Sequence, residues 1–283
     1  MINLKKEVDN INELLQEKRE KLKLTFTEEG HIYTMLDLYN VLRDDFPSVS
    51  TVEKNYYDEF DAAQKALDKS FGNVEGQQEL LAEWAAAGKY ATDMGSRAHY
   101  ELEKYILRKN KIKKETREPI YECCEQQIID SDNMIKAGQK FLDLMESRGC
   151  VLLDTEVVLG SPELGFVGQA DNFWLCLNKD KTGFGFIITD HKTNKPKNLV
   201  PMPYNDNMLS PFNKWISFAL THYYVQLGLY ARLFKEMLKG TKYEDIPLLG
   251  CILDSLRSDG TFEEYRVPKE FTDYFLTTKK ILT

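Results

Sequence analysis

The feature that most constrains the fold is a run of strand-like segments that begins just after residue 149. Three segments rich in β-branched and aromatic residues follow one another, namely VLLDTEVVLG (151–160), FVGQADNFWLCL (166–177) and GFGFIITDHK (183–192). Such segments predict β-strands. The turn-forming NKDKT at 178–182 joins the last two as a hairpin. The sequence therefore predicts a β-meander in the second half of the chain.

Helical patterns surround this meander. Apolar residues at helical spacing predict an amphipathic helix up to about Lys23, and mostly helical structure from 59 to 110. Further helices are expected before Gly149 and between about 213 and 239, and short hairpins near each end of the chain. This order predicts a mixed α/β domain around a central sheet flanked by helices. We expect a helical appendage at 1–24 and one domain at 25–283.

Composition limits the classes of function. The 283-residue chain has 37 Lys and Arg against 45 Asp and Glu, a net charge of −8, which argues against general nucleic-acid binding. Any such binding must be local, and the basic run is 104–117, in which Glu115 is the single acid. From charge alone, this run is typical of a solvated helix end and its loop.

The five cysteines form no CxxC pair, so we expect free thiols and neither a disulfide framework nor an iron–sulfur cluster. No apolar run reaches the ~20 residues that cross a bilayer, and the first residues lack the apolar core of a signal peptide. We therefore expect no membrane partner and a cytoplasmic protein.

The central hairpin places acids together. If it turns at Asp180 and Lys181, Asp171 lies directly opposite Asp190, and Lys192 points to the same face. Opposed like charges destabilise a sheet, and a divalent cation, which prefers carboxylate oxygens, would relieve the repulsion. The alternative is that these acids lie at strand ends in water, where Lys192 pairs with them.

Four short motifs then match one family in order. GFVGQADNF (165–173) and FIITDHKT (186–193) resemble the Gly-x-x-Asp and Asp-x-Lys-Thr strands of the PD-(D/E)XK nuclease superfamily, in its RecB-like and phage exonuclease branch. YYVQLGLYARL (223–233) is similar to its Gln-x-x-x-Tyr helix. MGSRAHYELEKYI (94–106) resembles its helix with Gly95, His99 and Glu103. Here Ser96 replaces the usual Thr, and serine also caps helices.

The resemblance extends from about 31 to 267 and implies a restriction-endonuclease-like core with a Mg²⁺- or Mn²⁺-dependent site at one sheet edge. It implies metal ligation by His99, Asp171, Asp190 and the carbonyl of His191. It also implies that Lys192 orients or deprotonates the attacking water. Glu156 is either a further metal ligand or a solvent-facing strand residue.

Other residues have both a functional and a structural interpretation. Gln226 and Tyr230 lie four residues apart on one face of the predicted helix. They could position Lys192 or the nucleic-acid backbone, and the same spacing equally suits hydrogen bonds that only stabilise the fold. His99 could also be a border residue of a packed helix. The basic run follows the His99 helix directly, so we expect phosphate contacts from Lys104, Arg108, Lys109, Lys111, Lys113 and Lys114.

Taken together, these features predict a metal-dependent deoxyribonuclease, with exonuclease or flap processing favoured over endonuclease cutting. Its expected setting is phage DNA replication, recombination or packaging in the host cytoplasm. Expected partners are DNA ends or single-stranded flaps and phage recombination or replication proteins, and an oligomer is left open. The alternative is a catalytically weak or inactive nuclease-fold protein that serves as a binding or scaffold subunit, which the negative charge favours.

Overall fold

The computed structural model describes residues 2–27, 29–114, 116, 119–203 and 205–282. Within them, the main sheet has five strands in the order β4-β5-β6-β7-β8. Only the β6–β7 pair is parallel there. The predicted mixed α/β fold is therefore confirmed. The strands are β4 (Val151–Ser161), β5 (Phe166–Leu177), β6 (Phe184–Lys192), β7 (Leu248–Leu256) and β8 (Phe262–Arg266).

The β5–β6 hairpin has the predicted register. Asn172 lies opposite Thr189, and the pairing continues without a shift to Leu177 and Phe184. The loop at 178–183 is held locally, because the Asp180 carboxylate accepts hydrogen bonds from the backbone and hydroxyl of Thr182. Asp171 and Asp190 thus lie one step beyond the last paired positions.

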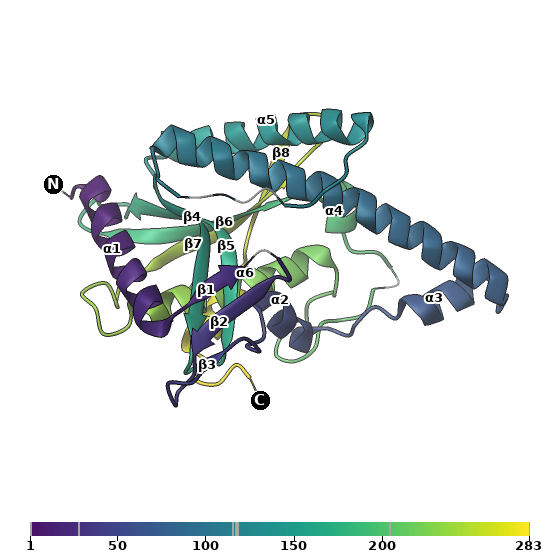
Figure 1. Ribbon diagram of the computed structural model, residues 1–283, viewed down its shortest axis with the longest axis horizontal. Coiled ribbons are helices and arrows are strands. Elements are labelled where there is room, and N and C mark those ends of the chain that lie inside the picture. The colour runs from purple at the N-terminus through teal and green to yellow at the C-terminus, as the bar shows by residue number, and fades with distance from the viewer. Residues whose placement is uncertain (1, 28, 115, 117–118, 204, 283) are drawn as a thin grey trace.

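Helices cover both faces of the sheet (Figure 1). α4 (Val74–Asn110) and α5 (Glu125–Ser147) pack on one face, in a core cluster that includes Trp174. α6 (Ala219–Leu238) packs on the other face, and α7 (Lys269–Thr277) packs against α6, in a larger cluster that includes Phe173. α1 (Leu4–Leu22) packs against β4 through a buried apolar side, and Asn12 donates a hydrogen bond to the Leu153 carbonyl.

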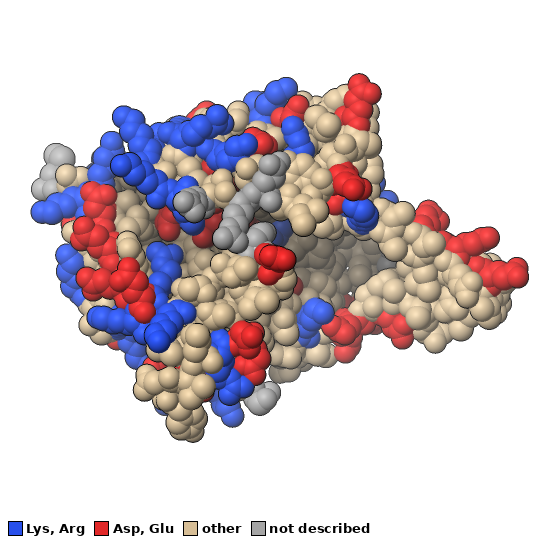
Figure 2. Space-filling model, viewed as in Figure 1, with Lys and Arg blue, Asp and Glu red and all other residues tan. Residues whose placement is uncertain are grey.

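A smaller set of elements precedes the main sheet. It comprises β1 (Thr25–Thr27), β2 (Ile32–Leu36), β3 (Leu42–Arg43), α2 (Val49–Val52), the 3₁₀ helix η1 (Glu53–Tyr56) and α3 (Ala62–Lys69); a second 3₁₀ helix, η2 (Pro196–Leu199), follows β6. The first three strands form an antiparallel sheet. α3 runs beside the first half of α4, and together they form an arm that projects from the body (Figures 1 and 2).

Two predictions were wrong in detail. The helix expected from about 213 begins at Ala219, because Trp215 and Ser217 hydrogen-bond back to the backbone of Met208 and Asp206 instead. Cys150 and Cys176, expected as free thiols, form a disulfide, since the β4–β5 pairing places them opposite each other. Cys251, which is buried, is a free thiol as predicted.

None of the described helices combines the length and the apolar composition that crossing a membrane requires.

Candidate metal centre

The centre begins at an irregularity in β4. β4 and β5 pair on either side of Glu156 and Asp171, and this register places the two residues opposite each other. Glu156 has a left-handed backbone with φ of +48°, a conformation that costs a non-glycine residue about 1–3 kcal/mol. Strain of this kind inside a strand needs support from neighbouring groups, and two side chains supply it.

Gln169 and Lys114 hold the strained residue. The Gln169 amide donates a hydrogen bond of 2.8 Å to Oε2 of Glu156. Lys114 Nζ donates to the carbonyl oxygens of Thr155 and Glu156, at 2.5 and 2.8 Å. The backbone and the carboxylate of Glu156 are thus fixed separately.

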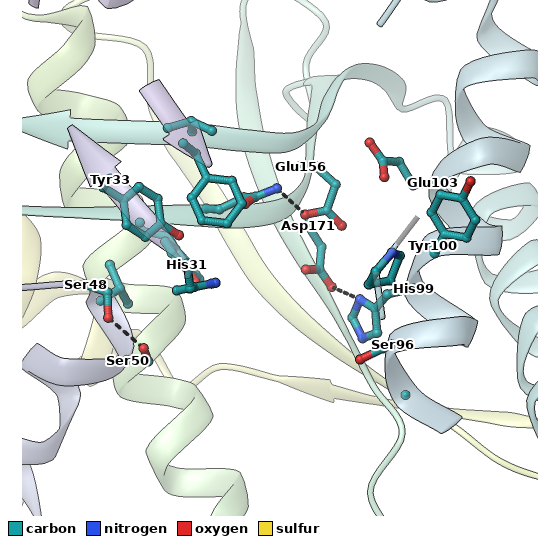
Figure 3. Close-up of a pocket in the computed structure, with 18 of the residues that line it drawn as sticks. His31, Tyr33, Ser48, Ser50, Ser96, His99, Tyr100, Glu103, Glu156 and Asp171 are labelled. Atoms are coloured by element: carbon teal, nitrogen blue, oxygen red, sulfur yellow. Dashed lines mark hydrogen bonds and ion pairs between the residues drawn. The ribbon is translucent and has the colours of Figure 1, made fainter. Parts of the chain in front are cut away.

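His99 reaches the same point from α4. Its Nδ1 lies 3.6 Å from Oδ2 of Asp171, and Figure 3 shows the imidazole pointing towards that carboxylate. Ligand atoms of His99, Glu156 and Asp171 all lie within 4.8 Å of one another. The approach of α4 depends on Gly95, because a Cβ there would lie 2.9 Å from Oγ1 of Thr193, the residue that follows β6. The glycine therefore brings His99 close to the sheet edge.

Asp190 and Lys192 form a buried ion pair beside this cluster. Lys192 Nζ lies 2.5 Å from Oδ2 of Asp190 and 4.6 Å from the centre of the Tyr223 ring. Asp190 is 2% exposed, and apart from Lys192 its Oδ2 accepts no hydrogen bond from the described residues. The backbone N–H of His191 donates a hydrogen bond of 2.6 Å to Oδ2 of Asp171, which links the two strands of the hairpin.

The electrostatics of the centre show crowded negative charge. Burial, with the nearby Asp171, raises the pKa of Glu156 well above its ordinary value, and burial raises that of Asp190 to about 7 despite the opposing Lys192. Burial lowers the pKa of His99, and Asp171 opposes this. Burial disfavours charge on both Asp171 and Lys192, but neighbouring charges outweigh it, so the pKa of Asp171 is lowered and that of Lys192 raised.

The His191 side chain lies outside this cluster. Its Nδ1 lies 2.6 Å from Oδ2 of Asp254 on β7, and its Nε2 lies 3.0 Å from Nδ2 of Asn172. Burial lowers the pKa of His191, but the charge of Asp254 outweighs it and raises the value to about 9. The imidazole is therefore committed to structural contacts, which leaves the backbone carbonyl as the predicted ligand.

Gln226 and Tyr230 of α6 line the same cavity of about 880 Å³ as His99, Glu156 and Asp171. Oε1 of Gln226 is buried and has no hydrogen-bond partner among the described residues. Tyr230 is buried, and its ring lies against Gly168. A Cβ at position 168 would lie 2.9 Å from Cε1 of Tyr230. The motif glycine thus lets the Tyr230 ring pack against β5.

The basic residues have different surroundings. Lys109 pairs with Asp143 and Glu146 of α5, and Lys114 is bound to β4 as described above. Lys104 Nζ lies 2.9 Å from Oε1 of Glu101. The three remaining basic residues predicted to contact phosphates, Arg108, Lys111 and Lys113, are exposed. Glu115 and Arg117 of the run lie outside the described residues. The predicted phosphate contacts of all six residues stay predictions.

Glu53 of η1 lies near Lys192 and was not among the predicted site residues. Tyr57 donates a hydrogen bond of 3.2 Å to its Oε1, while Oε2 is buried without a partner among the described residues. Burial raises the pKa of Glu53 to about 7, and the charge of Lys192 opposes the shift. The one relevant sequence signal was the Ser48 cap of α2, which fixes the start of the segment but not its approach to Lys192.

Comparison with known proteins identifies no family for the chain. No protein-family model matches the chain, and no curated protein matches it. The function is therefore inferred from the motifs and from the geometry of the centre.

Proposed function

We propose that the chain is a metal-dependent nuclease that hydrolyses DNA phosphodiester bonds. The observation that carries the proposal is the convergence of His99, Glu156 and Asp171 beside the Asp190–Lys192 pair. Carboxylate oxygens are ligands that both Mg²⁺ and Mn²⁺ prefer. The imidazole nitrogen favours Mn²⁺ over Mg²⁺.

The charges of the centre fit a divalent cation. Glu156 and Asp190 both have raised pKa values because they are buried close to other acids. Two positive charges at this point would favour their ionised forms and would release protons on binding. When bound, such an ion would polarise a phosphate and lower the pKa of a water molecule.

The protein's own groups supply the rest of the proposed reaction. Asp190 keeps Lys192 protonated, so Lys192 is placed to orient a water molecule and to offset negative charge that develops on the phosphate. The raised pKa of Lys192 favours this role over that of a general base. Gln226 lines the same cavity, and its buried amide oxygen has no hydrogen-bond partner among the described residues.

We propose that the enzyme acts on DNA ends or flaps, as the motifs of the phage exonuclease branch imply. The net charge of −8 supports local contacts near the centre over extended duplex binding. The alternative, an inactive binding subunit with a nuclease fold, is favoured by the same charge. A cleavage assay separates the two.

The test uses linear, circular and single-stranded DNA, and RNA, each with Mg²⁺, Mn²⁺ or EDTA. We expect metal-dependent loss of linear DNA and no loss with EDTA. Asp171→Asn should abolish cleavage, whereas Asp273→Asn, on the exposed surface of α7, should cleave like wild type. Failure of wild type to cleave any substrate, or full activity of Asp171→Asn, would refute the proposal.

A further inference from the structure

Three aromatic rings line the cavity that contains the candidate metal centre. They come from the β1–β2 hairpin, where Phe26 lies directly opposite Tyr33, with ring centres 4.6 Å apart. The His31 ring packs edge-on against both, with centres 4.9 Å from Phe26 and 5.5 Å from Tyr33. The hairpin therefore presents a compact aromatic cluster to the cavity.

The three rings differ in exposure. Tyr33 is buried at 5%, Phe26 is half-buried and His31 is exposed. His31 has a φ of +52° and follows Gly30, whose φ is +78°, so two successive left-handed residues turn the chain there. Tyr33 thus supports a cluster in which His31 and Phe26 offer ring surface to a ligand.

The cluster and the metal centre lie in one cavity. Figure 3 shows His31 and Tyr33 on one side, His99 and Tyr100 on the other, and Asp171 between them. The cavity volume of about 880 Å³ is in the range of sites that enclose a small organic molecule. A nucleotide can therefore place its base and its phosphate in the same cavity.

The basic side chains that line the cavity already contact other groups of the protein. Among the described residues that line it, the lysine and arginine are Lys114, which binds β4 carbonyls, and Arg19, which lies 4.0 Å from Asp154. Phosphate attraction by these two groups is correspondingly reduced. Where few free cations attract the phosphates, aromatic rings that stack on unpaired bases can supply the affinity for a single strand. Such stacking occurs with any of the bases.

We propose that Phe26, His31 and Tyr33 form a stacking subsite for one unpaired nucleobase of the strand whose phosphate lies at the metal centre. This inference rests on the proposed nuclease function and specifies its substrate class. The base must be free of its stacked neighbours next to the cleaved bond, since both faces of a base inside a duplex are covered. Duplex DNA is then attacked only at frayed ends or flaps.

The test measures binding, so that it does not depend on cleavage. Fluorescence anisotropy of the full chain with Ca²⁺ would compare three oligonucleotides of about twelve nucleotides: a single strand, the same strand with abasic sites throughout, and a blunt duplex. We expect the base-bearing strand to bind roughly tenfold more tightly than the abasic strand, as stacking of one base predicts.

The variants are His31→Asn, which tolerates a left-handed backbone, and Phe26→Leu, which keeps apolar volume. Both should reduce the preference for the base-bearing strand. The matched control is Tyr39→Asn, which removes a ring that is 85% exposed in the β2–β3 turn and does not line the cavity. Its preference should equal that of wild type.

Two binding results would overturn the inference. One is equal binding of the abasic and base-bearing strands, including absence of binding to both, and the other is an unchanged preference in both variants. Cleavage of abasic and normal strands at equal rates would refute the stacking subsite while supporting the nuclease. A base preference without any cleavage would support the subsite and refute the nuclease.

Discussion

Replacing Lys114 by methionine tests how the strained residue of the centre is held. Lys114 Nζ donates hydrogen bonds of 2.5 and 2.8 Å to the carbonyls of Thr155 and Glu156. Hydrogen bonds from charged groups contribute about 1.5–3 kcal/mol each, and partial exposure places these at the lower end. That is the size of the ~1–3 kcal/mol strain expected for the left-handed Glu156.

Loss of Lys114 should therefore let the Glu156 backbone relax and move its carboxylate away from Asp171. It also removes a positive charge that lowers the pKa of Glu156. Loss of a group that orients a metal ligand costs about 10–100-fold in metal affinity. We expect that loss for Mn²⁺, measured by electron paramagnetic resonance titration of Lys114→Met without DNA.

The control is Lys113→Met, which removes the neighbouring exposed lysine and should leave Mn²⁺ affinity unchanged. If Lys114 instead contacts phosphate, Lys114→Met will keep wild-type Mn²⁺ affinity. It will then reduce the slope of DNA affinity against salt concentration by about 0.7–0.9 on logarithmic axes. That outcome would refute the positioning role.

Two further predictions concern stability. Burial and the charge of Asp171 raise the pKa of Glu156 in the folded protein, so the contribution of Glu156 to stability falls as the pH rises above the ordinary pKa of a glutamate. Glu156→Gln should therefore raise the melting temperature of the metal-free protein more at about pH 8 than at about pH 5. Equal effects at the two pH values would contradict this. Gly168→Ala should lower the free energy of unfolding in urea by about 1–3 kcal/mol, because its Cβ would clash with Val49 and Tyr230. The control is Gly250→Ala, whose Cβ would meet open space, and equal losses in both variants would contradict this.

The hairpin that carries Asp171 and Asp190 could be predicted because its signals are local. Alternating apolar residues set the faces of the strands, and Asp180 with Thr182 closes the loop that fixes the register. The position of His99 beside Asp171 was predicted through motif resemblance, since helix periodicity alone equally suited a packed border residue.

The rest of the centre depends on contacts between distant segments. Glu156 has a left-handed backbone although both of its neighbours, Thr155 and Val157, are β-branched residues that favour extended strands, so no local signal indicates the strain. Lys114 reads as a member of a basic run, and its binding to β4 spans 42 residues of chain. Glu53 reaches the surroundings of Lys192 through the packing of η1, which no local pattern encodes.

An anomalous difference map from crystals of the full chain grown with Mn²⁺ would locate the metal ion itself. We expect a peak within about 2.0–2.3 Å of a His99 imidazole nitrogen and of carboxylate oxygens of Glu156 and Asp171. Cleavage of linear DNA with Mn²⁺, combined with no peak at these three residues, would contradict this expectation.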